Sequence, residues 1–222
     1  MDEHGTRVRP EVTLKWAQTI DGRVATTTGH SRWISGPEAR ILAHRLRAEH
    51  DAILVGVGTV LADNPQLTTR LVAGPDPLRV ILDSRLRTPP GAAVVRSGTL
   101  IATRSDAPVD RERLLAERGA EVARTRAHSP HVDPRQVMAL LSARAVRSVL
   151  VEGGPTLITT FLRARLADRV VVVLAPAISG SGMDAVGALG IDDIAGSIGF
   201  EAATFDRAHG DAIFHGRPIW PL

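Results

Sequence analysis

The chain has 222 residues, of which 44% are hydrophobic and 23% are charged, values typical of a globular protein with one large core. It contains no cysteine, which excludes disulfides, zinc–thiolate sites and thiol nucleophiles and suits a reducing compartment. The formal net charge is only +3 and arginines are interspersed with acids, so the sequence pI of about 10.7 does not indicate nucleic-acid binding.

The N-terminal segment is not expected to be a targeting signal. Met1–Arg7 contains acidic residues and lacks an apolar core, so it does not resemble a signal peptide. The longest apolar run, Val170–Ala177, is too short to span a bilayer. We therefore expect a cytoplasmic protein without membrane contact, with a tail over residues 1–10 and a single domain over residues 11–218.

The first elements are a strand and a helix. Val12–Ala17 is rich in strand-forming residues and ends before a turn at Asp21-Gly22. Ser35 is predicted to cap the next helix, with Glu38 closing a capping box. The apolar stripe of that helix consists of Ala39, Leu42, Ala43 and Leu46.

The same alternation of short strands and helices continues along the chain and predicts an α/β domain with a largely parallel sheet. The expected strands are Ala52–Val57, Arg79–Asp83, Thr99–Thr103, Val122–Arg124, Ser148–Glu152 and Arg169–Leu174. The expected helices are Asp110–Arg118, Pro134–Arg144 and Pro155–Arg165. Residues 179–199 are expected to form a loop. Phe200–Ala208 and Asp211–Gly216 are predicted to form a C-terminal β-hairpin.

The clearest local signal for function is the turn Glu152-Gly153-Gly154-Pro155-Thr156 between a strand and a helix. Pro155 stands where a first-turn proline costs no hydrogen bond. Free backbone N–H groups and the helix dipole favour an anion at such a helix start, and glycine lets a phosphate approach the main chain. The same glycines also suit a turn that only packs a helix closely on a strand. The spacing leaves both interpretations open.

Several other residues have a functional and a structural interpretation. Thr59 and Asp63, which follow the glycine-rich exit of a strand, could face one pocket or belong to a short helix with its own caps. Trp33 could stack on a ring or fill the core. Arg47 and Arg70 are candidates to bind phosphate, because guanidinium pairs bidentately with it, although most arginines are solvated surface charges. The histidines lack zinc-site spacing, and no Walker loop occurs, so no metal is expected.

Taken together, segments in this order resemble the pyrimidine reductase domain of bacterial riboflavin biosynthesis. The matching segments are Val12–Ala17, Asp21–Arg23, Ser31–Ser35, Leu46–Gly56, Gly58–Thr68, Ile81–Ser84 and Val151–Leu157. The resemblance runs from Glu11 to Pro218. It implies a dihydrofolate-reductase-like fold, a homodimer and NADPH as hydride donor. The implied substrate is a small phosphorylated molecule, 5-amino-6-(5-phosphoribosylamino)uracil, whose ribose is reduced to a ribityl chain.

The resemblance also implies roles for individual residues. The positions that match cofactor contacts are Ala17, Trp33, Thr59, Asp63, Ser84, Gly153, Gly154, Pro155, Thr156 and Leu157. The positions that match substrate contacts are Ser31, Arg47, Leu67, Arg70 and Glu152.

The catalytic residue that moves a proton stays open among three candidates. Lys15, the only lysine, occupies a position that lines the site, and Asp63 and Glu152 are the others. Arg85 or Arg104 could meet the 2′-phosphate of the cofactor.

One departure from the bacterial pattern bears on the substrate. The chain has none of the H-x-E and P-C-x-x-C motifs of the zinc deaminase that often precedes this reductase. We therefore expect a separate deaminase to supply its substrate, or a related pyrimidine or pterin to replace that substrate. A non-catalytic NADP-binding regulator is the remaining alternative. Lys15, Asp63, Arg70 and Glu152 count against a regulator, which need not keep both the substrate and the cofactor residues.

Overall fold

The computed structural model describes residues 9–31, 34–127 and 129–221, so Trp33 lies outside the described residues. The chain forms two compact units, each built from separate stretches of sequence. Unit 1 comprises Met1–Glu11 and Arg47–Leu150, and unit 2 comprises Val12–Leu46 and Val151–Leu222.

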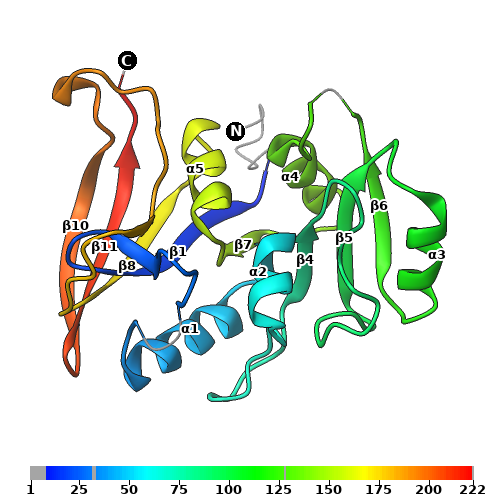
Figure 1. Ribbon diagram of the computed structural model, residues 1–222, viewed down its shortest axis with the longest axis horizontal. Coiled ribbons are helices and arrows are strands. Elements are labelled where there is room, and N and C mark those ends of the chain that lie inside the picture. The colour runs from blue at the N-terminus through cyan, green and yellow to red at the C-terminus, as the bar shows by residue number, and fades with distance from the viewer. Residues whose placement is uncertain (1–8, 32–33, 128, 222) are drawn as a thin grey trace. The chain divides into compact units, whose positions relative to one another are not determined.

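Unit 1 contains a parallel sheet (Figure 1). In spatial order its strands are β7 (Ser148–Val151), β3 (Ala52–Gly56), β4 (Leu78–Leu82), β5 (Thr99–Arg104) and β6 (Glu121–Thr125). The pairs β3–β4, β4–β5 and β5–β6 are parallel, as the sequence predicts. Ile53, Leu54 and Val55 are fully buried, because a parallel strand is covered on both faces.

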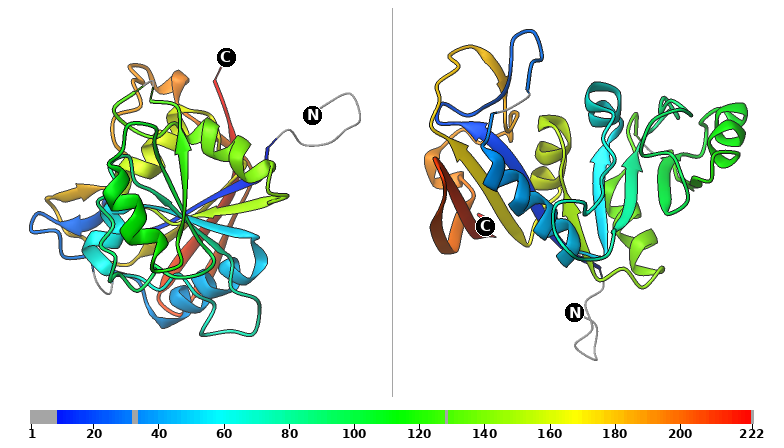
Figure 2. Two further views of the ribbon diagram at one scale, coloured as in Figure 1. Left: turned by 90° about the vertical axis from the view of Figure 1, so that its right-hand side faces the viewer. Right: turned by 90° about the horizontal axis from the view of Figure 1, so that it is seen from below.

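Three helices lie wholly within the described residues of unit 1. They are α2 (Val57–Asp63), α3 (Val109–Ala116) and α4 (Pro134–Ser142). The left view of Figure 2 looks onto the end of unit 1 that carries α3 and β6. Asp133 caps α4 by accepting a 2.9 Å hydrogen bond from the N–H of Arg135. The core of unit 1 contains apolar side chains of β3, β4 and β5 that cluster with residues of α2 and with Leu115 of α3.

Unit 2 contains a mixed sheet. Its strands in spatial order are β10 (Gly199–Ala208), β11 (Asp211–Ile219), β8 (Arg169–Ala175) and β1 (Glu11–Thr19). β1 and β8 are parallel, whereas β11 is antiparallel to both β8 and β10. The predicted C-terminal hairpin is confirmed, and His209 at its turn has a φ of 53°. Figure 1 shows the two strands of the hairpin, in orange and red, side by side.

The predicted capping box at the first helix is wrong. Helix α1 (Pro37–Glu49) begins at Pro37, so Gly36 and not Ser35 occupies the capping position. Proline is preorganised for the first helical position, and the N–H of Gly36 donates a 2.8 Å hydrogen bond to the Asp211 carboxylate. A carboxylate from a strand distant in sequence thus accepts the N–H of the capping residue, a bond for which the predicted capping box used Glu38.

The prediction of a loop over residues 179–199 is also partly wrong. This stretch contains β9 (Gly182–Asp184), which pairs antiparallel with β2 (Arg23–Thr26), and a short 3₁₀ turn at Ile194–Gly196. A three-residue strand has no detectable alternation, and it forms here through a pairing between segments far apart in sequence. Arg23 forms an ion pair with Asp184 in this small sheet.

Helix α5 (Pro155–Arg163) follows β7 and belongs to unit 2. Its apolar face is buried, with Phe161 fully inaccessible to solvent. None of the helices in the described part of the chain is long and apolar enough to cross a membrane.

Candidate functional site

The two glycines of the turn before α5 have different surroundings. A Cβ at Gly153 would lie 2.5 Å from Cδ2 and 2.8 Å from Cβ of Leu157, so only glycine fits there. A Cβ at Gly154 would have no atom within 4 Å. The packing interpretation therefore applies to Gly153, and the anion-binding interpretation stays a prediction for Gly154. Gly153 permits close packing, and Gly154 borders open space.

The start of α5 has the features of an anion site. Gly154 is the N-cap, with φ −71° and ψ 174°, and no side chain caps the helix there. Pro155 is at the first helical position, and the N–H groups of Leu157 and Ile158 both donate to the carbonyl of Gly154, at 3.0 and 3.2 Å. Thr156, in the first turn, is exposed. The unbonded N–H groups of a first turn and the helix dipole favour a negative charge.

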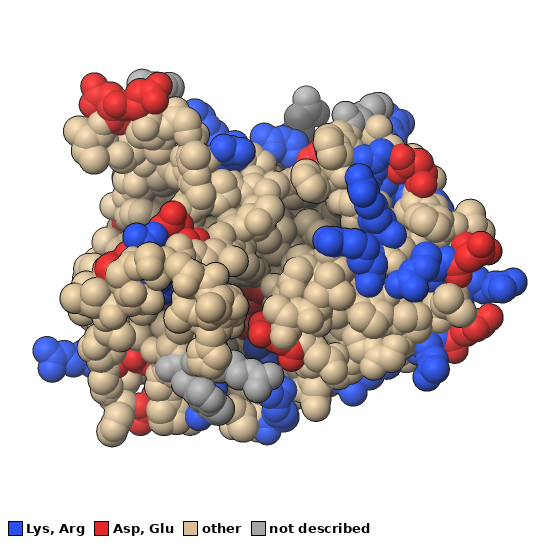
Figure 3. Space-filling model, viewed as in Figure 1, with Lys and Arg blue, Asp and Glu red and all other residues tan. Residues whose placement is uncertain are grey.

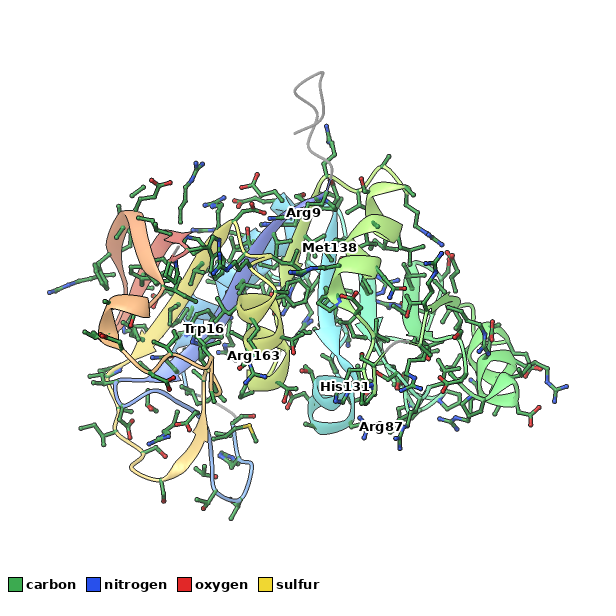
Figure 4. All side chains as sticks on the ribbon, turned by 90° about the horizontal axis from the view of Figure 1, so that it is seen from above. Arg9, Trp16, Arg87, His131, Met138 and Arg163 are labelled. Atoms are coloured by element: carbon green, nitrogen blue, oxygen red, sulfur yellow. The ribbon has the colours of Figure 1, made fainter. Side chains whose placement is uncertain are left out.

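Strand β1 places Lys15 and Ala17 on one face of the sheet of unit 2. Residues two apart on a strand point the same way, so these two share a face and Trp16 and Gln18 take the other. The indole N–H of Trp16, labelled in Figure 4, donates a 2.6 Å hydrogen bond to the Gln18 amide oxygen. Lys15 is half-buried, as a lysine at the wall of a site would be.

Ser31 and Glu152, the remaining predicted residues of unit 2, are both half-buried. Ser31 lies in the segment between β2 and α1. Glu152 directly follows β7, whose Val151 is fully buried, so a buried strand presents this carboxylate at its carboxyl end.

In unit 1, three predicted cofactor contacts lie at the carboxyl edge of the sheet. Thr59 and Asp63 share a face of α2, because residues four apart on a helix are neighbours. Ser84 follows β4, and its hydroxyl accepts a 3.0 Å hydrogen bond from the N–H of Val132. β3 and β4 are parallel neighbours with Gly56 opposite Leu82, so both strand exits face the same way.

Arg47 and Arg70 meet at Thr68. Arg47, in the last turn of α1, donates a 3.2 Å hydrogen bond to the Thr68 carbonyl. Arg70 donates a 3.4 Å hydrogen bond to the Thr68 hydroxyl. Two guanidinium groups are thereby held around one residue. The sequence predicts that both arginines are candidates to bind phosphate, but it does not predict that they lie close together.

Leu67 occupies a different environment from the one expected of a substrate contact. Its side chain is 2% exposed and belongs to the core of unit 1. Its φ is 55°, a left-handed conformation that is uncommon for residues other than glycine and concentrates at functional sites. A contact with a ligand would therefore use its main chain.

Sequence reasoning missed the residue that orders the loop after β4. Asp83 is fully buried and accepts hydrogen bonds from the N–H of Thr88 at 2.6 Å and from its hydroxyl at 2.7 Å. Arg111 of α3 holds the same loop by donating to the carbonyls of Leu86 and Thr88, each at 3.0 Å. The sequence signal for this contact is a carboxylate, Asp83, at the end of a buried strand and a hydroxyl, Thr88, five residues later.

Comparison with known proteins identifies the fold and the family. The fold is that of dihydrofolate reductase, as shown by similarity to the Enterococcus faecalis enzyme, with a TM-score of 0.51, 13% identity, and coverage of 94% of this chain and 96% of that one. Residues 10–204 match the model of the RibD C-terminal domain. The chain therefore belongs to the RibD C-terminal domain family, which contains pyrimidine reductases of riboflavin biosynthesis.

Individual relatives agree with this. The chain is 40% identical over 197 residues to riboflavin biosynthesis protein RibD of Aquifex aeolicus, a match that covers 87% of this chain and 53% of that protein. It thus spans about half the length of that relative. It is 41% identical over 202 residues to 2,5-diamino-6-ribosylamino-4(3H)-pyrimidinone 5′-phosphate reductase of Methanothermobacter thermautotrophicus, covering 87% of this chain and 91% of that protein.

A solved structure supports the same relationship. The diaminohydroxyphosphoribosylaminopyrimidine deaminase/5-amino-6-(5-phosphoribosylamino)uracil reductase of Thermotoga maritima is 32% identical, with a TM-score of 0.78. The similarity covers 95% of this chain and 57% of that one. The predicted mostly parallel α/β fold of the dihydrofolate reductase type is confirmed.

Proposed function

We propose that this chain is an NADPH-dependent reductase that converts the ribose of 5-amino-6-(5-phosphoribosylamino)uracil to the ribitylamino product in riboflavin biosynthesis. The observation that carries the proposal is the meeting of Arg47 and Arg70 at Thr68, in a chain of this family. A planar guanidinium recognises phosphate bidentately, and two of them suit a doubly charged 5-phosphate. Ser31, Glu152 and the main chain of Leu67 would hold the rest of the substrate.

The residues present fit a dinucleotide cofactor. Gly154 borders open space at an uncapped helix start, which is where a phosphate can approach backbone N–H groups. When bound, NADPH supplies the hydride. The residues proposed to hold it are Ala17, Trp33, Thr59, Asp63, Ser84, Gly153, Gly154, Pro155, Thr156 and Leu157.

Reduction of the ribosylamine requires the protein to position the two reactants and to move protons. Opening of the ribosylamine ring gives the ring oxygen a proton and leaves a C=N bond at the sugar C1. Reduction of that bond adds a hydride to C1 and a proton to nitrogen. Lys15, Asp63 and Glu152 are the side chains proposed to hold or move these protons. Orientation of the two reactants supplies the remaining acceleration.

The undeaminated pyrimidinone is the second candidate substrate. The name of the Methanothermobacter relative assigns it a 2,5-diamino substrate, and this chain spans 91% of that relative. The two candidates differ only in the group at position 2 of the ring, an amine or an oxygen. Both carry the 5-phosphate that Arg47 and Arg70 would bind.

We further propose that residues 11–218 act as one reductase domain and that the enzyme is a homodimer. The exposed edge strand β10 supports the dimer, because Phe205 on it is 67% exposed although its ring contacts Phe214 of the same hairpin. A multiply charged substrate and cofactor do not cross a membrane unaided, so we propose that the enzyme acts in the cytoplasm.

NADPH oxidation with three compounds tests the proposal. They are the deaminated phosphoribosylaminouracil, its 2,5-diamino counterpart and dihydrofolate. We expect turnover with the first. Turnover only with the second would reassign the substrate, and turnover only with dihydrofolate would contradict the pathway. Tight NADPH binding with no turnover of any compound would indicate a regulator.

A further inference from the structure

The turn of the C-terminal hairpin contacts the start of helix α1. The Asp211 carboxylate, which follows the turn, accepts a 2.8 Å hydrogen bond from the N–H of Gly36, a residue 175 positions earlier in the chain. His209, in the turn itself, has its Nδ1 3.6 Å from Oε1 of Glu38, which is in the first turn of α1. Figure 1 shows the turn between β10 and β11 near the start of α1. Two contacts therefore join a hairpin late in the chain to a helix near its beginning.

Asp211 is buried, unlike the acidic side chains that Figure 3 shows on the surface. Its exposed fraction is 5%, and within residues 9–31, 34–127 and 129–221 the other buried carboxylate is Asp83. A carboxylate is costly to bury unless it is hydrogen-bonded. The N–H of Gly36 supplies such a bond, and the positive end of the dipole of the 13-residue helix α1 favours a negative charge there. The start of α1 thus stabilises Asp211, and Asp211 in turn fixes the start of α1.

The strand register places Asp211 at the end of the sheet that carries Ala17, a proposed cofactor contact. On β11, Ile213 is opposite Val173 of β8, and Val173 is opposite Ala17 of β1. Asp211 is two residues before Ile213, so it lies towards the carboxyl ends of β1 and β8. Neighbouring strands are about 4.8 Å apart, and two such spacings separate β11 from β1. Asp211 therefore lies at the end of the sheet where the proposed site begins, on a strand that carries none of the proposed contacts.

The segment between β2 and α1 carries Ser31, a proposed substrate contact, and is anchored on both sides of it. Before Ser31, the N–H of Thr26 donates a 3.0 Å hydrogen bond to the carbonyl of His30, and the N–H of His30 donates a 3.2 Å hydrogen bond to the Thr26 hydroxyl. After Ser31, the N–H of Gly36 donates to Asp211. The first anchor is local to β2. The second depends on a residue from the opposite end of the sequence.

Two anchors restrict the positions that Ser31 can adopt. Ser31 is half-buried and directly follows the first anchor. A contact with substrate requires its hydroxyl in one place, and a small displacement caused by a change far from the reacting atoms is enough to lower the rate of an enzyme. Loss of the second anchor would release the segment on the α1 side of Ser31.

We propose that Asp211 is a positioning residue of the reductase. It acts through Gly36, fixes the end of the segment that carries Ser31, and so presents the Ser31 hydroxyl to the substrate without touching the substrate itself. This proposal rests on the proposed function, because it takes Ser31 to be a substrate contact. A purely structural role at the start of α1 is the alternative, and it predicts a lower stability with an unchanged KM.

Three variants of the full chain separate these roles. Asp211→Ala removes the acceptor, whereas Asp211→Asn keeps an oxygen that can accept the N–H of Gly36. The control is Asp206→Ala, which removes an exposed carboxylate from the same hairpin, where it lies 3.4 Å from Nε2 of His215 on the neighbouring strand. Circular dichroism and Tm establish that each variant is folded.

NMR relaxation tests the anchor without reference to the reaction. We expect the backbone order parameter at Ser31 to fall in Asp211→Ala, from about 0.85, the value of a rigid backbone, towards roughly 0.6. It should stay unchanged in Asp206→Ala. An order parameter that is the same in Asp211→Ala as in the original chain would overturn the proposal.

Steady-state kinetics at saturating NADPH tests the effect on whichever pyrimidine substrate the chain reduces. Asp211→Ala should raise its KM by roughly tenfold, and Asp211→Asn by about two- to threefold, because a neutral acceptor replaces a charged one. Asp206→Ala should leave KM unchanged. An unfolded fraction lowers the apparent kcat and not KM. If Asp211→Ala does not fold, the smaller rise in Asp211→Asn serves the same comparison.

A double-mutant cycle with Ser31→Ala identifies the route. Ser31→Ala should itself raise KM by at least as much as Asp211→Ala. In a chain that already carries Ser31→Ala, Asp211→Ala should add less than about a twofold rise, because the contact that Asp211 positions is already lost. A full tenfold rise in both backgrounds would overturn the proposal, since Asp211 would then affect the substrate by another route.

Two further results would also overturn the proposal. One is an unchanged KM in folded Asp211→Ala, which would leave a structural role at α1. The other is an equal rise in KM in Asp211→Ala and Asp211→Asn, which would exclude the hydrogen bond to Gly36 as the cause. An original chain that reduces none of the tested pyrimidines would instead remove the proposed function, and with it the role of Asp211 in substrate binding. The order parameter at Ser31 would still show whether Asp211 holds the segment.

Discussion

Gly153 and Leu157 are in such close contact that a single methyl group at Gly153 would overlap the leucine side chain, 2.5 Å from Cδ2 and 2.8 Å from Cβ. The second of these atoms is fixed to the helix and cannot rotate away. Gly153 is therefore required for the close approach of this turn to the first turn of α5, independently of any ligand.

Gly153→Ala is expected to destabilise the protein by about 1–3 kcal/mol, as overpacking of a core does. Gly154→Ala is the matched control, because its φ of −71° suits alanine and its surroundings are open, so its free energy of unfolding should change by about 0.5 kcal/mol or less. Urea unfolding followed by circular dichroism measures both. Equal losses in the two variants would contradict the packing role of Gly153.

Arg47→Gln and Arg70→Gln should each raise KM for the phosphorylated substrate by roughly 10- to 100-fold, since each removes a charged donor to the phosphate. With the dephosphorylated substrate, the variants and the original chain should have similar KM values. The original chain should itself have a high KM for that compound. Arg45→Gln, an exposed position on the same helix α1, is the control. A loss that is the same for both substrates would show that the two arginines do not bind the phosphate.

Lys15→Ala and Asp63→Ala should lower kcat by roughly 100-fold or more, the contribution typical of a side chain that moves a proton. The NADPH dissociation constant should change much less. Steady-state kinetics and calorimetric titration separate the two quantities. Unchanged turnover in both variants would leave Glu152 as the remaining candidate.

Asp83→Ala should destabilise the protein by about 1–3 kcal/mol, because it leaves the N–H of Thr88 buried without a partner. Thr88→Val removes only the hydroxyl bond to the same carboxylate, so its loss should be smaller, about 1 kcal/mol. Chemical unfolding of both variants gives the comparison. A larger loss for the valine variant than for the alanine variant would argue against Asp83 as the centre of this loop.

Acid should weaken the contact between the turn after β1 and the segment after β8. The hydroxyl of Thr19 and the N–H of Ser179 donate to Asp21 and lower its pKa from 3.8 to about 2. A carboxyl whose pKa is lower in the folded state stabilises the protein above pH 3.8, and that stabilisation is lost as the pH falls towards 2. The difference in Tm between the original chain and Asp21→Asn should therefore shrink from pH 5 to pH 2. A constant difference would assign the effect to something other than this charge.

The order of strands and helices could be predicted from the sequence, because each element depends on residues that are close together in the chain. The apolar run of Ile53–Val55 and the stripe on α1 both reflect periodicity, which matches burial on a strand or one face of a helix. The alternation of these elements also indicates a parallel sheet. The candidate arginines and the glycine turn were identified for the same reason, since residue type and spacing carry their chemistry.

Contacts between residues far apart in the chain could be decided only by the tertiary structure. The carboxylate of Asp211 accepts the N–H of Gly36 at the start of α1, and β9 forms by pairing with β2, which is far away in sequence. The convergence of Arg47 and Arg70 on Thr68 depends on how a loop returns to the end of a helix. Leu67 is a core residue with a left-handed backbone, a conformation that its identity does not predict.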